Sequence, residues 1–172
     1  MKRPPLKVIG PSIVYIPLTR GFFALVDDIS FGRVFQHDWI AHKGKTSDGS
    51  YAFANIRDDA GVQHPAFMHR VIAGLQPRDG KKIDHINGNG LDNRVCNLRE
   101  CSHEENMRNR RMGKNNTTGL KGIYLDRNSN LWKATISVKG RTIHLGKFSD
   151  KEAAHEAYAS AAQKLHGEFA RP

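Results

Sequence analysis

The sequence predicts an α+β protein made of several small sheets and few helices. Short apolar runs rich in β-branched and aromatic residues occur at residues 13–16 and 22–26, separated by a turn that contains Pro and Gly, which is the pattern of short strands. Residues 131–138 alternate apolar and polar side chains with a period of two, as a half-buried strand does. An alanine-rich helical stripe at residues 153–165 follows. Neighbouring strands followed by a helix favour the α+β class.

The composition indicates a polyanionic partner. The 172 residues include 27 Lys and Arg against 17 Asp and Glu, which gives a net charge of +10 and an isoelectric point near 9.9. Such a surplus favours nucleic acid first and a membrane surface second. No apolar run approaches the roughly 20 residues that span a bilayer, and prolines interrupt any signal-peptide core. We therefore expect a soluble, cytoplasmic protein with no membrane partner.

Residues 1–66 are predicted to form a β-rich N-terminal region. After the two strands already named, residues 27–35 favour a short helix, and residues 39–42 and 51–56 favour a second strand pair around a Gly-containing turn. The sequence leaves open whether this region contacts a substrate or braces its neighbour. Four large apolar side chains are predicted core residues: Trp39, Phe53, Phe67 and Ile72.

A central Asn-rich stretch carries groups suited to hydrolysis. It opens on Asp84 and His85, turns through Asn-Gly pairs at residues 87–90, and reaches Asn97 and Asn106. Hydrolysis of a phosphodiester needs an activated water and a positive charge beside the phosphate. An imidazole, with an ordinary pKa of about 6.5, suits the first task. Carboxylate and carboxamide oxygens are hard ligands for a divalent cation, which performs the second.

The order of these residues sets a geometric condition. Adjacent side chains on a strand face opposite sides, so Asp84 and His85 serve one site only if the strand bends or the phosphate lies across its edge. The Asn-Gly pairs favour a tight hairpin there. Asn87, Asn89 and Asn93 are predicted to act in turn formation.

A zinc site is the competing interpretation of this stretch. Cys96, Cys101 and His103 supply three zinc ligands, but no fourth ligand stands at a convincing spacing, so free thiols are favoured.

The pattern D-H-I-x-G-N-x-x-D-N-R-x-x-N-L-R, from Asp84 to Arg99, followed by Asn106, resembles the HNH endonucleases of the phage and homing-endonuclease branch. The resemblance implies a ββα-metal unit over residues 67–112, with Asp84 and Asn106 as metal ligands and His85 as the general base. It implies that Asn97 braces the loop and orients the His85 ring. The implied cofactor is one divalent cation, Mg²⁺ or Mn²⁺. His69 matches a common upstream element and either packs at the site, touches phosphate or belongs to the core.

A polar linker at residues 113–118 precedes a second unit at residues 119–172. Strands at 122–125, 131–138 and 142–146 are predicted, followed by a helix that starts in a capping box at Ser149 and ends at Gly167. Lys121-Gly122-Ile123, Trp132 to Ile136, His144 to Phe148 and the alanines that follow resemble the ethylene-response-factor (apetala-type) DNA-binding domain, in which a three-stranded sheet packed by one helix enters the major groove.

The resemblance and the basic residues between the units predict the side chains that contact DNA. They are Arg108, Arg110, Arg111, Lys114, Lys121, Tyr124, Arg127, Lys133, Thr135, Lys139, Arg141 and His144. Phosphate contacts are expected to dominate over base contacts, because Thr, Ser and His stand where the plant proteins carry Arg and Trp.

The sequence therefore predicts a metal-dependent DNA endonuclease of the homing or free-standing phage type, acting on double-stranded DNA in the host cell cytoplasm if a phage encodes it. The alternative is a non-catalytic DNA-binding regulator with a degenerate HNH unit, and RNA is a further substrate to test. The target sequence, nicking versus double-strand cleavage, the preferred metal and the oligomeric state stay open, although a monomer would suffice.

Overall fold

The computed structural model describes residues 6–7, 13–44, 49–58, 60–76, 79–109 and 116–170. The chain divides into two compact units, Met1–Ser102 and His103–Pro172. The described residues of the first unit form small antiparallel sheets and those of the second form one, with helices packed beside them, which confirms the predicted α+β class.

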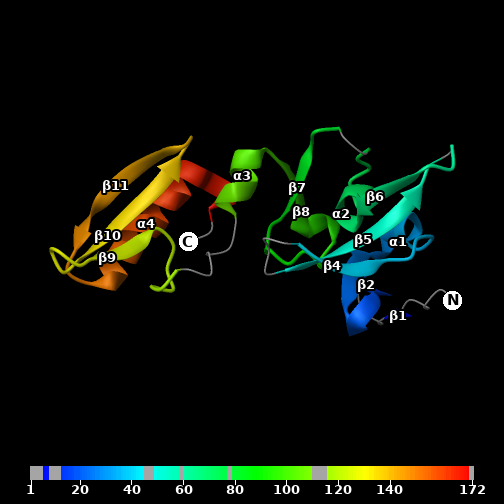
Figure 1. Cartoon of the computed structure of the whole chain (residues 1–172), viewed down its shortest axis with the longest axis horizontal. Helices are drawn as coiled ribbons and strands as arrows, with labels where there is room; N and C mark the ends of the chain where they lie inside the picture. Colours follow the sequence, from blue (N-terminus) through cyan, green and yellow to red (C-terminus); the bar gives the residue numbers. More distant parts are fainter. Residues whose placement is uncertain are drawn as a thin grey trace. The chain divides into compact units, whose positions relative to one another are not determined.

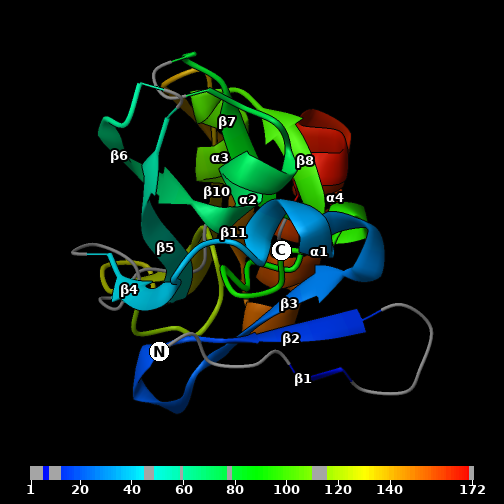
Figure 2. The same ribbon diagram turned by 90° about the vertical axis from the view of Figure 1, so that its right-hand side faces the viewer.

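The first sheet of the first unit is antiparallel with the order β1-β2-β3, formed by β1 (Leu6–Lys7), β2 (Ile13–Pro17) and β3 (Phe23–Asp27). The 3-10 turn η1 (Thr19–Gly21) joins β2 to β3, and α1 (Asp28–Val34) follows. Figure 2 shows the three strands side by side in blue. Both predicted strands and the short helix are confirmed.

The second sheet has the order β4-β5-β6, formed by β4 (Ile40–Lys43), β5 (Ser50–Arg57) and β6 (Gln63–Phe67), and α2 (Met68–Ile72) follows it. The pairing of β4 with β5 was predicted, whereas β6 was not. Part of the predicted turn between β4 and β5, at residues 45–48, lies outside the described residues.

One apolar core joins both sheets to the two helices of the first unit. It contains Val14, Ile16, Leu18, Ala24, Val26, Val34, Trp39, Ala52, Ala54, Met68 and Ile72. Two of the four predicted core side chains, Trp39 and Ile72, are 5% exposed. Phe53 and Phe67 are half-buried and pack against each other, with ring centroids 5.5 Å apart.

The central stretch forms a two-stranded antiparallel hairpin of β7 (Lys82–His85) and β8 (Leu98–Cys101). The prediction of a tight hairpin is wrong, because residues 86–97 form a long loop that ends in the 3-10 turn η2 (Val95–Asn97). The Asn-Gly pairs turn the chain inside this loop, where Gly88 has a φ of 68° and its N–H donates to the His85 carbonyl at 2.8 Å.

The second unit begins with α3 (His103–Arg108), followed by the sheet of β9 (Ile123–Asp126), β10 (Leu131–Val138) and β11 (Arg141–Phe148) in the order β11-β10-β9. Helix α4 (Lys151–His166) lies across one face of this sheet, and the short η3 (Gly167–Phe169) follows it (Figure 1). The sheet and helix bury Ile123, Ala134, Ile136, Ala154, Tyr158 and Ala162. The predicted three-stranded meander with one packed helix is confirmed.

The ends of α4 agree with the prediction at one terminus only. Gly167 ends the helix with a φ of 54°. The N-cap is Asp150 and not Ser149, because the Asp150 carboxylate accepts from the Ala153 N–H at 2.7 Å. Asp and Ser cap helices about equally well, so the sequence alone did not separate the two neighbours.

Candidate functional site

His85 ends β7 and is almost completely buried, at 5% exposure. Its Nε2 lies 3.2 Å from Oδ1 of Asn93, which is fully buried. The ring also contacts Tyr51 and His69, with centroid separations of 5.9 and 4.9 Å. The loop residue Asn93 and the strand-borne aromatic rings therefore fix the orientation of this imidazole.

The hydrogen bond to Asn93 defines which nitrogen of His85 is basic. An amide oxygen only accepts, so Nε2 donates and the lone pair of the neutral ring is on Nδ1. Burial lowers the pKa of His85, and the bond to Asn93 and the charges of Asp84 and Asp92 oppose this shift. The pKa below its ordinary value keeps the imidazole neutral at physiological pH, as a proton acceptor must be.

His69 is a core histidine that supports His85. Its ring stacks on Phe67 with a centroid separation of 5.6 Å and an interplanar angle of 12°, and meets the His85 ring edge-on. Burial, with the nearby His85 and Arg70, lowers the pKa of His69 to about 3. Its buried Nδ1 has no hydrogen-bond partner among the described residues. His69 therefore packs as a neutral ring.

Asp84 lies beside His85 in β7 and is 6% exposed. It stands opposite Arg99 of β8, whose Nε and Nη2 donate to Oδ2 of Asp84 at 3.1 and 2.8 Å. Asp84 and His85 thus have different described partners, as expected for adjacent residues on a strand. The guanidinium fixes the carboxylate and offsets part of its charge.

The described residues contain no group of three His, Cys, Asp or Glu side chains that could hold a metal ion. A site with one carboxylate and one carboxamide is compatible with this finding, because Mg²⁺ keeps several waters and takes few protein ligands. Asn106, the second predicted ligand, is half-buried in α3 and belongs to the second unit, whereas Asp84, His85 and Asn97 belong to the first.

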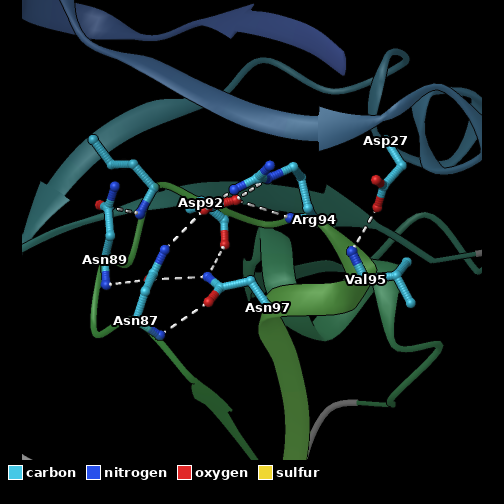
Figure 3. A network of polar contacts seen from close by, with 8 residues as sticks. Asp27, Asn87, Asn89, Asp92, Arg94, Val95 and Asn97 are labelled. Carbon is cyan, nitrogen blue, oxygen red and sulfur yellow. Dashed lines mark hydrogen bonds and ion pairs between the residues drawn. The ribbon is translucent and has the colours of Figure 1, made fainter. Parts of the chain in front are cut away.

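Asn97 is the centre of the hydrogen bonds that hold the loop (Figure 3). Its Nδ2 donates to the Asp92 carbonyl at 2.7 Å and to Asn87 Oδ1 at 3.0 Å, and its Oδ1 accepts from the Asn87 N–H at 2.9 Å. These bonds are those of a loop brace, as predicted for Asn97. The described hydrogen bond of the His85 ring is donated to Asn93 Oδ1 and not to Asn97.

The other polar residues of the loop hold its turns. Asn87 Oδ1 accepts from the Asn89 N–H, and Asn89 Oδ1 accepts from the Leu91 N–H, so both asparagines act as predicted. Arg94 donates through Nε and Nη2 to the two oxygens of Asp92, both at 2.7 Å. The Arg94 guanidinium lowers the pKa of Asp92 below its ordinary value.

The free edge of β3 anchors this loop. The Leu25 N–H donates to the Leu91 carbonyl and the Asn93 N–H donates to the Leu25 carbonyl, both at 2.8 Å. Asp27 accepts from the Val95 N–H at 2.5 Å (Figure 3). Asn93, which contacts His85, is thereby attached to a strand almost 70 positions earlier in the chain. Sequence reasoning left the role of this region open and missed Asn93, because both depend on long-range contacts.

Gly90 allows the loop to approach β5 closely. A Cβ at this position would lie 2.6 Å from the Tyr51 ring and 2.7 Å from the Ser50 carbonyl oxygen. Tyr51 also contacts His85, so the close approach contributes to the walls of the site.

The face of the β9-β10-β11 sheet opposite α4 carries several predicted DNA contacts. Tyr124, Lys133 and Lys147 are aligned across the three strands, and Thr135 pairs with His144. Asp126 forms ion pairs with Lys133 at 2.8 Å and with Lys147 at 3.3 Å. The lysines and Ser129 strongly lower the pKa of Asp126. This face therefore carries its own carboxylate beside its lysines.

The remaining predicted contacts have varied environments. Arg127, Lys139, Arg141 and His144 are exposed, and Arg108 and Lys121 are partly buried. Arg110, Arg111 and Lys114 lie outside the described residues.

The two cysteines do not support a zinc site. Cys96 is exposed, Cys101 is buried, and neither forms a disulfide. Within the described part of the chain, no helix is both long and apolar enough to cross a membrane.

Comparison with known proteins identifies the central stretch. Residues 66–108 match the family model described as HNH endonuclease. Protein 3.8 of Escherichia phage T7 is 35% identical over 92 residues, which cover 54% of this chain and 75% of that protein. A protein of Acanthamoeba polyphaga mimivirus named as an uncharacterized HNH endonuclease is 28% identical over 165 residues, 94% of this chain and 81% of the relative.

No solved structure matches the chain. The comparisons give no evidence for an ethylene-response-factor domain at residues 119–172, so that resemblance stays a hypothesis. With its central motif matched by the family model and a phage protein related over three quarters of its length, this chain belongs to the HNH endonuclease family.

Proposed function

We propose that this protein is a metal-dependent DNA endonuclease, of the homing or free-standing phage type, in which His85 is the general base. The observation that carries the proposal is the setting of His85: a buried, neutral imidazole whose Nε2 is bound to Asn93, next to a carboxylate in an HNH domain. In the neutral ring whose Nε2 donates to Asn93, Nδ1 carries the lone pair and is the proposed proton acceptor.

In the proposed reaction, His85 Nδ1 takes a proton from a water that attacks phosphorus in line with the leaving 3′ oxygen. A new oxygen–phosphorus bond forms, the bond to the 3′ oxygen breaks, and the leaving oxygen takes a proton from solvent. The product carries a 5′-phosphate. Asn93 holds the ring in the tautomer that this step needs, and Asn97 supports the loop that carries Asn93.

Asp84 and Asn106 are the proposed ligands of one divalent cation, Mg²⁺ or Mn²⁺. Their oxygen donors suit these hard ions, and Arg99 holds the Asp84 carboxylate in place. When bound, the cation neutralises charge on the phosphate and on the leaving oxygen.

The proposed organisation assigns DNA binding mainly to the C-terminal part. Residues 1–66 would brace the HNH unit at 67–112, and residues 119–172, after a linker at 113–118, would hold double-stranded DNA through the exposed sheet face. The net charge of +10 and the exposed Arg127, Lys139 and Arg141 support phosphate contacts. Affinity that depends on phosphate contacts falls steeply as salt rises.

One observation favours the alternative of a non-catalytic DNA-binding regulator. The Asp84 carboxylate is buried and paired with Arg99, which reduces its attraction for a cation. A regulator would bind DNA without cutting it.

A plasmid-nicking assay in Mg²⁺ and in Mn²⁺ tests the proposal. We expect the wild type to convert supercoiled plasmid to open-circular or linear DNA, with EDTA stopping the reaction. His85→Ala and Asp84→Asn should each lose at least about a hundredfold in rate, as expected for loss of a general base or a metal ligand.

The matched control is His64→Ala, which removes a histidine of β6 that is paired with Asp58 and has no described contact with the loop. Cleavage by His85→Ala at the wild-type rate would refute the mechanism. DNA binding without cleavage by any of the proteins would favour the regulator. Competition between duplex DNA and RNA determines the substrate class.

A further inference from the structure

The second unit contains a hollow of about 570 Å³ that the nuclease site does not use. It lies between α3, one end of β10 and the C-terminal end of α4. Its charged side chains and histidines are predominantly basic: Arg108, Lys121, Lys139, His103, His166 and Glu104. Ser137 adds a hydroxyl, and Asn116 adds an amide whose Nδ2 also donates to the Leu120 carbonyl at 2.7 Å. The Thr135 hydroxyl, which lines the hollow too, donates to the Gly122 carbonyl at 3.3 Å.

At the rim of this basic hollow the Lys121 ammonium is bonded to the backbone of Arg108. Lys121 Nζ donates to the Arg108 carbonyl oxygen at 3.1 Å, at the C-terminal end of α3. Glu104 lies 3.5 Å from the Arg108 guanidinium, and its side chain is 63% exposed. Because the Glu104 carboxylate is solvated and the separation is long, Glu104 only weakly offsets the positive charge.

His166 lines the same hollow and lies close enough to its cations to be affected by them. Burial is the largest cause that lowers its pKa, and the positive charges of Arg108 and Lys121 lower it further. A histidine at the end of a helix usually gains from the helix dipole when it is protonated. Here the nearby cations act against protonation of His166, in addition to burial.

The backbone beneath Lys121 is fixed. Gly122 has a φ of +64°, and a Cβ there would lie 2.3 Å from the Thr135 carbonyl oxygen and 2.4 Å from the Tyr158 ring. The Thr135 N–H also donates to the Gly122 carbonyl at 2.8 Å. Lys121 therefore projects from a segment that is packed against β10, so the basic hollow exists before any ligand arrives.

We propose that the basic hollow seats a phosphate group of the DNA backbone, with Arg108 and Lys121 as the charged partners and Lys139 at the rim. The proposal rests on the proposed function, which supplies DNA as the partner. A backbone phosphate is a singly charged anion with oxygen acceptors, which matches two cations flanked by hydroxyl and amide groups. Free inorganic phosphate shares this chemistry, and the experiment separates the two sources.

Anisotropy of a fluorescent duplex in EDTA, measured with the full chain over a range of salt concentrations, is the first arm. We expect Arg108→Gln and Lys121→Gln each to weaken binding about tenfold and to reduce the slope of log affinity against log salt by about 0.9, the value for one phosphate contact. Lys121→Arg keeps the charge and should keep most of the slope.

The matched control is Lys164→Gln, which removes one exposed charge from α4 and does not line the hollow. Lys164→Gln should change the slope of log affinity against log salt by less than half as much as Lys121→Gln does. Equal effects of Lys121→Gln and Lys164→Gln would overturn the phosphate seat, while duplex binding by the wild type would leave the proposed function standing.

The second arm follows the His166 ring by NMR during titration with the duplex or with inorganic phosphate. Binding of an anion nearby should raise the pKa of His166, and Lys121→Gln should remove the effect of the duplex. If inorganic phosphate moves the signal and the duplex does not, the ligand is free phosphate and the proposal fails. If the wild type binds no duplex at all, the proposed function fails with it.

Discussion

The loop at residues 86–97 and the exposed face of the β9-β10-β11 sheet are both polar, but their side chains are held in different ways. In the loop, Asp92, Asn93 and Asn97 are buried. The Asn97 side chain donates to the Asp92 carbonyl, and the Asn93 N–H donates to a carbonyl of β3. On the sheet face, Lys133 is paired with Asp126 near solvent. The difference indicates that the proposed catalytic loop is rigid before substrate binds, whereas the sheet face must exchange an internal ion pair for a DNA phosphate.

The largest expected effect comes from a substitution in the buried loop. Asn93→Ala removes the acceptor that orients His85 and should lower the nicking rate about a hundredfold, in the range seen when a group that orients a catalytic side chain is lost. Asn89→Ala, which removes an exposed turn residue of the same loop, is the control and should lose only a few-fold. Circular dichroism checks that both variants fold. Equal rates for the two variants would show that Asn93 does not position His85.

Packing of the loop on β5 gives the next effect. Gly90→Ala forces a Cβ against the Tyr51 ring and the Ser50 carbonyl, and should lower the free energy of unfolding by about 1–3 kcal/mol. Gly32→Ala is the matched control, because Gly32 lies in α1 with no atom within 4 Å of the added Cβ. It should raise stability by about 0.5–1 kcal/mol. Urea unfolding measures both, and a neutral Gly90→Ala would mean that the loop is not held against β5.

The neutral ring of His69 predicts a pH dependence of stability. Its pKa is about 3 when folded and near its ordinary value of 6.5 when unfolded. Between these values the unfolded state binds the additional proton, so stability should fall as pH falls below 6.5, by up to about 1.4 kcal/mol per pH unit. His69→Phe should flatten this part of the curve in urea unfolding at several pH values. An unchanged slope would place the proton uptake on another group.

The smallest expected effect comes from a substitution on the exposed face of the β9-β10-β11 sheet. Asp126→Asn releases Lys133 and Lys147 and should strengthen duplex binding a few-fold at low salt, with a steeper salt dependence. Glu156→Gln removes one exposed negative charge from α4 and controls for net charge. If both variants bind equally, Asp126 does not compete with DNA at this face.

The predictable parts of this molecule are those with local signals. The alternation at residues 131–138 matches β10, and the alanine stripe that follows matches α4. Gly167 ends that helix because it adopts a positive φ, which few other residues tolerate. The spacing of Asp84, His85 and Asn97 identified the HNH motif, and Asn97 lies where a loop brace was expected.

The missed parts depend on tertiary contacts. Asn93 resembles a turn residue in sequence, and only the fold places its amide against His85. The pairing of Leu25 with the loop has no local signature, since any strand edge offers the same N–H and carbonyl groups. Strand β6 was missed because Pro65 interrupts it, although the edge of a sheet tolerates proline.

The anchoring of the loop on β3 has a practical consequence for any attempt to shorten this protein. The match to the HNH family model begins at residue 66, yet the backbone partners of Leu91 and Asn93 belong to Leu25. An excised fragment of residues 66–108 would retain every motif residue and lose the support that keeps Asn93 in place. In this chain the segment that the family model matches is smaller than the segment that must fold together.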